Sequence, residues 1–149
     1  MLRSLETTST AELLQQWPDG RIKLLLTQRL LRFRREHPLL FQRGTYSPLT
    51  VTGAFAESCV AFARAHEGKW IAVVVPRLSS RVGFPPIGEK WQDTAVELPS
   101  SLSRQNTREL FTDRDLPSDN SALKLSDAMA ILPFAVYANQ GGALSKPPA

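Results

Sequence analysis

An uninterrupted run without glycine or proline, Arg21 to Arg35, most constrains the fold of this chain. The run is rich in leucine, arginine and glutamine, which are good helix formers. Asp19 is placed to cap its start, because a carboxylate there can accept hydrogen bonds from the free N–H groups of the first turn. Pro38 cannot continue a helix and disfavours the helical region at His37. The sequence therefore predicts one long helix between Asp19 and His37.

Two apolar lines run along this predicted helix. With about 100° between residues, a broad stripe holds five apolar side chains: Ile22, Leu25, Leu26, Leu30 and Phe33. Leu24 and Leu31 form a second line on roughly the opposite side. A helix on a single core needs only one stripe, so we expect this helix to pack between two bodies. The alternative is that Leu24 and Leu31 are ordinary exposed leucines.

Arg29 falls inside the broad apolar stripe. A lone charge in such a place is costly unless it is paired. A guanidinium needs a carboxylate or several carbonyl oxygens as partners. We therefore expect Arg29 to tie the helix to the rest of the chain, and we assign Leu24, Arg29 and Leu31 to interfaces.

The excess positive charge is confined to the helix and its exit. The chain has 149 residues and a net charge of +4. Residues 19–43 contain seven basic and two acidic residues, or +5, and the remaining eleven basic and twelve acidic residues give −1. A basic helix can bind a phosphate backbone. No zinc-finger spacing or Gly-rich aromatic RNA-binding signature accompanies it, so nucleic acid is not the expected partner.

The sequence carries no membrane or export signal. No apolar run is long enough to span a membrane, and the N-terminus has no apolar segment typical of a signal peptide. Cys59 is the only cysteine, which excludes an intrachain disulfide and agrees with a reducing compartment. We expect a cytoplasmic protein without membrane contact.

After Pro38 the pattern changes from helical to strand-like. Short runs of β-forming residues, separated by turn signals, predict strands at 45–52, 59–66, 69–76, 94–98, 108–112, 122–125 and 134–138. Glu67 and Gly68 predict a tight turn between the second and third strands. Pro48 favours an edge position for the first strand. The third strand is nearly all apolar, which predicts a central position.

Two shorter helices are also predicted. Residues 8–16 favour a short helix with Ser9 or Thr10 as its N-cap, and Ser126 can cap a single helical turn that extends through Ile131. The predicted fold is therefore mainly β: an antiparallel β-sandwich preceded by one short and one long α-helix. We divide the chain into a helical lead-in (1–36), a β-sandwich (37–139) and a flexible tail (140–149).

No active site follows from the residues themselves. His37 and His66 do not lie at metal-ligand spacing, and Asp113 and Asp115 lack the further oxygen ligands of a calcium loop. No pair of carboxylates stands out for glycoside chemistry, and no phosphate-binding glycine loop is present. No cofactor or metal is expected. Trp70 and Trp91 could stack on sugars, although core packing is favoured for Trp70.

Several motifs, in their order, resemble a known family. They are Trp17-Pro-Asp-Gly-Arg-Ile-Lys, Val73-Val-Val-Pro-Arg-Leu, Gly88-Glu-Lys-Trp-Gln-Asp-Thr and Leu132-Pro-Phe-Ala. The exit of the long helix into a β region is similar to the junction between the last barrel helix and the C-terminal β domain of the α-amylase superfamily (glycoside hydrolase family 13). Together they resemble the C-terminal end of the maltooligosyltrehalose synthase family, over residues 13 to 138.

The resemblance implies a role without catalysis for this chain. That family converts the reducing-end α-1,4 bond of a maltooligosaccharide into the α,α-1,1 bond of trehalose, with catalytic carboxylates on a barrel. No position here matches those carboxylate motifs, and a complete barrel needs about 250 residues. We expect an excised C-terminal domain or a truncated gene product. Its partner would be the barrel of the enzyme, and it would meet the maltooligosaccharide only through that barrel.

Two other functions remain open at this stage. The first is a stand-alone carbohydrate-binding module that uses Trp70 or Trp91. The second is a nucleic-acid binder that uses the basic helix. Sugar titration would reveal the first function, and salt-dependent DNA binding would reveal the second.

Overall fold

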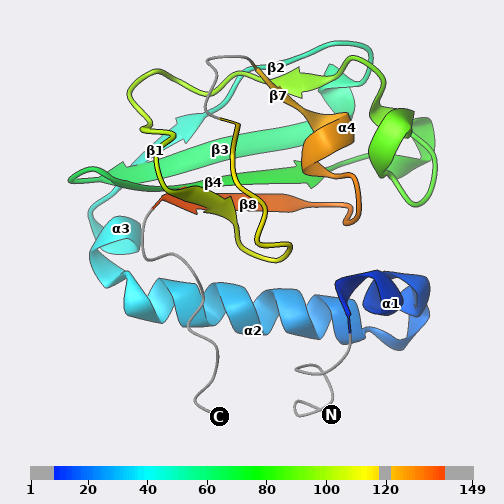
Figure 1. Cartoon of the computed structure of the whole chain (residues 1–149), viewed down its shortest axis with the longest axis horizontal. Helices are drawn as coiled ribbons and strands as arrows, with labels where there is room; N and C mark the ends of the chain where they lie inside the picture. The colour runs from blue at the N-terminus through cyan, green and yellow to red at the C-terminus, as the bar shows by residue number, and fades with distance from the viewer. Residues whose placement is uncertain (1–8, 118–121, 140–149) are drawn as a thin grey trace.

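The computed structural model describes residues 9–117 and 122–139. They form a small domain of mixed α and β structure, with two antiparallel sheets and a long helix along one side (Figure 1). The predicted antiparallel arrangement of the strands is confirmed, but the domain contains more helix than the predicted fold does. The tail predicted at 140–149 lies outside the described residues.

The larger sheet has five strands in the order β1-β3-β4-β8-β6. Their bounds are β1 (Thr45–Pro48), β3 (Cys59–His66), β4 (Lys69–Pro76), β8 (Ala135–Asn139) and β6 (Thr107–Glu109). The hairpin of β3 and β4 has the bounds that its sequence predicts, and Glu67 and Gly68 both take positive φ in its turn. β4 is central and β1 is an edge strand, as predicted.

The smaller sheet contains β2 (Val51–Thr52), β5 (Ala95–Val96) and β7 (Leu123–Lys124), in that order. The single strand predicted at 45–52 is therefore wrong, because the chain leaves the larger sheet after Pro48 and enters the smaller one. Leu49 lies between the two strands: its side chain is buried, and its N–H donates to the carbonyl of Ala61. Gly53 lets β2 approach β5 closely, since a Cβ atom there would lie 2.7 Å from the Cα of Thr94.

The chain begins its described part with α1 (Thr10–Gln15). Ser9 and Glu12 form a reciprocal capping box, in which each side chain accepts from the backbone N–H of the other. The predicted short helix is confirmed, and Ser9, one of its two predicted N-caps, is the one observed. A 3-10 turn, η2 (Trp17–Asp19), follows and leads to the long helix.

The long helix α2 (Arg21–Glu36) starts one residue later than predicted. Its N-cap is Gly20 rather than Asp19, because the preceding 3-10 turn ends in a left-handed residue with φ +77°, a conformation that glycine adopts without steric cost. Asp19 still contributes, since its carboxylate accepts from the Arg21 N–H at 2.9 Å and from Arg21 Nε at 2.7 Å.

Two short helices depart from the prediction. α3 (Pro38–Gln42) lies in a stretch for which no helix is predicted, but proline is well suited to the first position of a helix, where its missing N–H is not needed. α4 (Leu125–Ala128) begins before Ser126, so the predicted Ser126 cap is wrong. Lys124 occupies the N-cap position without a side-chain hydrogen bond.

The larger sheet has a core on each of its faces. Alternate residues of β4 point to opposite sides: Trp70, Ala72 and Val74 belong to the core shared with the smaller sheet, whereas Ile71 belongs to the core shared with the helices. The broad stripe of α2 enters this second core, with Ile22, Leu25 and Phe33 buried and Leu26 and Leu30 partly buried. The helical lead-in and the β region are thus joined by one continuous core, and α2 lies along the sheet (Figure 1).

Candidate functional site

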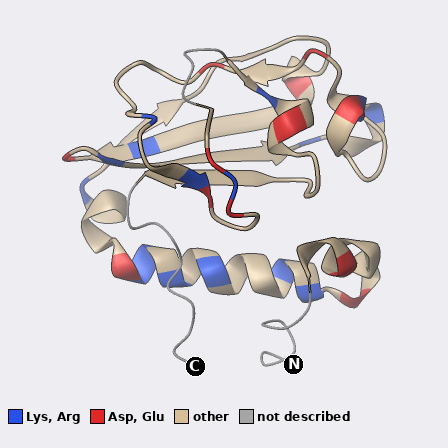
Figure 2. Ribbon diagram, viewed as in Figure 1, with Lys and Arg blue, Asp and Glu red and all other residues tan. Residues whose placement is uncertain are grey.

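The side of α2 that faces away from the sheet is basic with one leucine at its centre. We call this surface the outer face of α2, and it consists of five exposed residues: Lys23, Thr27, Leu31, Arg34 and Arg35. Leu31 is 57% exposed, which places it among the most exposed of the large hydrophobic side chains in the described part of the chain. Lysine and arginine recur along the helix (Figure 2). The outer face contains no acidic residue.

Leu24 does not share the exposure of Leu31. It is partly buried and packs against the helix-side core, to which α1 contributes the fully buried Leu13. α1 folds back beside the start of α2 (Figure 1). Of the second apolar line that the sequence predicts, Leu24 is therefore partly buried within this chain and Leu31 is exposed to solvent.

Arg29 contacts the β region at the aromatic ring of Phe111. Its guanidinium carbon lies 5.4 Å from the centroid of the Phe111 ring, close enough for a cation–π interaction. Burial lowers the pKa of Arg29, and the negative charge of Glu109 opposes this effect. Within the described residues Arg29 has no hydrogen bond or ion pair, so its main partner is a ring face and not the predicted carboxylate or carbonyl oxygens.

We expect Arg29→Ala to lower the free energy of unfolding by about 1 kcal/mol, because the variant loses both the cation–π interaction and the packing of the side-chain stem. Arg29→Met keeps much of the stem and should recover only part of this loss. Urea unfolding measures both variants, with Arg35→Ala on the outer face of α2 as the control. A methionine variant as stable as the parent would show that the charge contributes nothing.

Trp70 and Trp91 are core residues, and their predicted role as sugar platforms is wrong. Both side chains are buried, and each indole N–H donates to a backbone carbonyl: Trp70 to Ser103 at 3.0 Å and Trp91 to Pro86 at 2.7 Å. Neither ring presents a face to solvent. The preference for core packing at Trp70 is confirmed.

The aromatic rings that are exposed lie elsewhere. Trp17 and Phe84 meet edge to face with 5.1 Å between ring centroids, and they line an apolar groove of about 560 Å³ between α1 and the loop after β4. This loop includes the 3-10 turns η4 (Ser79–Arg81) and η5 (Gly88–Trp91). The sequence patterns singled out neither ring for exposure.

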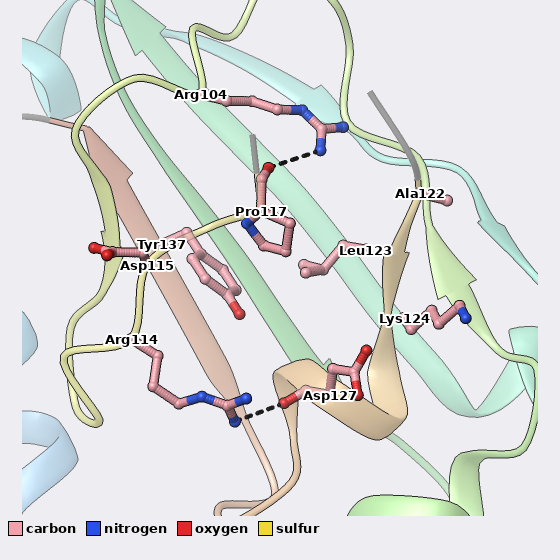
Figure 3. Close-up of a pocket in the computed structure, with 9 residues that line it drawn as sticks. All are labelled: Arg104, Arg114, Asp115, Pro117, Ala122, Leu123, Lys124, Asp127 and Tyr137. Carbon is pink, nitrogen blue, oxygen red and sulfur yellow. Dashed lines mark hydrogen bonds between the residues drawn. The ribbon is translucent and has the colours of Figure 1, made fainter. Parts of the chain in front are cut away.

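A polar pocket of about 230 Å³ lies between the two sheets and α4 (Figure 3). Its polar lining comes from β8, α4, β7 and the loops before and after β6: Tyr137, Asp127, Lys124, Arg104, Arg114 and Asp115. Pro117, Ala122 and Leu123 supply the apolar part. The polar residues are far apart in the sequence and share no spacing, so only the fold could bring them together.

Several of these side chains are held by specific contacts. Arg114 donates to the backbone carbonyl of Asp127 at 3.0 Å, and Arg104 donates to that of Pro117 at 3.3 Å (Figure 3). Asp115 is 3.1 Å from Arg108, whose pKa is raised by Asp113 and Asp115. Asp115 therefore pairs with a cation that does not line the pocket.

Tyr137 is the most buried polar side chain of the pocket, with 4% of its surface exposed. Its hydroxyl group points into the space between Arg114 and Asp127 (Figure 3). Burial raises the pKa of Tyr137, and the charges of Glu109 and Asp127 raise it further, against the opposing effect of Arg114. The hydroxyl group therefore stays protonated at neutral pH and can both donate and accept a hydrogen bond.

The described residues contain no group of side chains able to hold a metal ion. Across the same residues, no helix has the length and apolar character needed to cross a membrane. Comparison with protein-family models, curated proteins and solved structures gives no match. The outer face of α2, the apolar groove at Trp17 and Phe84, and the polar pocket are the candidate surfaces that the described residues present.

Proposed function

We propose that this chain is the C-terminal domain of a maltooligosyltrehalose synthase, itself without catalytic activity, that acts in the cytoplasm by supporting the catalytic barrel. The proposed finer description of the fold is the β-sandwich of α-amylase-type C-terminal domains. The family comes from the sequence motifs quoted above. The antiparallel sheets that follow a long helix agree with it.

One observation carries the proposal: Leu31 stands exposed among cations on a helix whose opposite side is buried. In a barrel enzyme the last helix has one face toward the barrel strands. α2 has one side on the sheet and leaves its outer face for that contact. Its cations would meet acidic groups of the barrel, and Leu31 would fill an apolar position among them.

The experiment combines the chain with a maltooligosyltrehalose synthase that lacks its own C-terminal domain. We expect the isolated chain to yield no trehalose-ended product from maltooligosaccharides, and the two proteins together to associate. Calorimetry measures the association. Leu31→Glu should weaken it at least tenfold, because the variant loses a buried leucine worth about 1.5–3 kcal/mol and adds a desolvated charge.

The matched control is Leu78→Glu, which places the same change at another exposed leucine, outside α2. We expect this control to associate like the parent chain. Association that survives Leu31→Glu unchanged would exclude the outer face of α2 as the contact. Trehalose-ended product from the pure chain would contradict the assignment of a non-catalytic role.

A further inference from the structure

We propose that His37 makes the corner between α2 and α3 sensitive to pH: the corner stays packed while the imidazole ring is neutral, and it opens when the ring is protonated. His37 is the residue between the two helices, as the C-cap of α2 and the N-cap of α3 (Figure 1). The inference depends on the packing of one ring and on no family, so it stands independently of the proposed function.

The ring of His37 is part of the packing that joins the two helices. Its centroid lies 4.4 Å from that of Phe33, a side chain of α2 that is almost completely buried. Phe41 of α3 meets the same Phe33 ring edge to face, with 6.1 Å between centroids. The backbone N–H of His37 donates to the carbonyl of Phe33 at 3.0 Å. A change in the state of the ring therefore acts on the contact between α2 and α3.

The Nε2 atom of His37 is shielded from solvent and has no hydrogen-bond partner among the described residues, although the residue as a whole is only half-buried. A neutral ring can leave this nitrogen as a bare acceptor, because the other nitrogen then carries the proton. In a protonated ring both nitrogens are donors. Protonation would therefore place an N–H group and a positive charge where no acceptor is present, and an unpaired group costs more when it is charged.

The charges of the neighbouring elements do not offset this cost. Burial lowers the pKa of His37, the positive charge of Lys69 lowers it further, and only Glu36 raises it. Lys69 is the first residue of β4, and Glu36 is the last residue of α2. The surroundings therefore favour the neutral ring.

The strand β3 packs against α3 and carries two further titratable groups near its end, Arg64 and His66. Arg64 donates to the carbonyl of Phe41 at 2.8 Å, so its guanidinium is bound to the backbone of α3. His66 lies 3.9 Å from the carboxylate of Glu67. Neither group accepts a hydrogen bond from Nε2 of His37.

The direction of the pH effect follows from the lowered pKa of His37. The folded chain binds the proton less readily than the unfolded chain, whose histidine has the ordinary pKa of about 6.5. The stability that the neutral ring provides is complete above that pH, and it is lost as the pH falls through the lowered pKa of the folded chain. The loss should be concentrated at the corner, because α3 has only five residues and short elements open locally.

The test compares the full chain by NMR at about pH 7.5 and about pH 5.5, the range in which histidine changes its charge. The chain has two histidines, so the variant His66→Gln assigns the Cε1 proton of His37. We expect this proton to titrate below pH 6.5. Amide exchange at Arg43, whose N–H donates to the carbonyl of Leu39 at 2.9 Å, measures the opening of α3. After correction for the intrinsic effect of pH on exchange, its protection factor should fall at least about threefold, and that of Leu49 should fall less.

His37→Phe keeps an aromatic ring against Phe33 and cannot be protonated, so the protection factor of Arg43 should stay constant in this variant. His66→Gln is the matched control, because it removes the other histidine and should retain the fall at Arg43. If His37→Phe folds poorly, the titration of His37 in the parent chain still decides. A Cε1 proton that titrates at or above pH 6.5, a constant protection factor in the parent, or an equal fall in His37→Phe would overturn the proposal.

Discussion

Glu109→Ala is expected to lower the free energy of unfolding by about 2–5 kcal/mol, because the carboxylate of Glu109 is the acceptor for several buried donors. Its Oε2 accepts from the N–H groups of Phe111 at 2.9 Å and Thr112 at 2.6 Å, and from the Thr112 hydroxyl at 2.7 Å. Its Oε1 accepts from the N–H of Val136 at 3.0 Å. Glu109 is only 2% exposed, so water cannot easily replace these bonds.

Urea unfolding of Glu109→Ala measures this loss, with Glu97→Ala at an exposed position as the control. Glu109→Gln separates the acceptors from the charge. Its carbonyl can replace Oε2, but its NH₂ group would then face the N–H of Val136, so we expect an intermediate loss. If Glu109→Ala unfolded at the same urea concentration as the parent, the carboxylate would not hold β6 to β8 as described.

Trp91→Ala is expected to cost about 3–5 kcal/mol, the usual range for removing a large aromatic side chain from a core. Trp91 is completely buried and meets Phe55 edge to face, with 6.5 Å between ring centroids. The variant leaves a cavity and also loses the hydrogen bond to Pro86. Thermal unfolding followed by circular dichroism measures the effect.

Trp17→Ala is the control for this prediction, because Trp17 is 51% exposed and should contribute less than 1 kcal/mol. Trp91→Phe keeps an aromatic ring and removes the N–H, so it should lie between the parent and Trp91→Ala. Should Trp91→Ala remain as stable as Trp17→Ala, the placement of Trp91 in the core would be contradicted.

The elements that the sequence predicts well are those with local causes. The β3–β4 hairpin depends on alternation within each strand and on a two-residue turn, and its bounds agree with the prediction. The N-cap at Ser9, one of the two predicted for the short helix, likewise depends on residues within one helical turn. The stripe of α2 is local too, and it identifies the buried residues Ile22, Leu25 and Phe33.

The features that escape prediction depend on partners distant in sequence. The division of 45–52 between two sheets requires Leu49 to be buried below β3 and Gly53 to approach Thr94. The pocket around Tyr137 joins residues from β7, α4, β8 and the loops before and after β6, and nothing in their spacing indicates it. The burial of Trp91 could not be predicted either, because a tryptophan in a loop can pack in a core or lie exposed to solvent.

The lengths of the strands have a consequence for how the molecule assembles. β3 and β4 close their hairpin across two residues, so little chain entropy is lost before their long ladder forms. β2, β5 and β7 pair over only two residues each, across long intervening segments. We therefore expect the smaller sheet to assemble after the hairpin. A probe of the β5–β7 pairing, such as amide hydrogen exchange at Val96, would then report on the fully assembled chain.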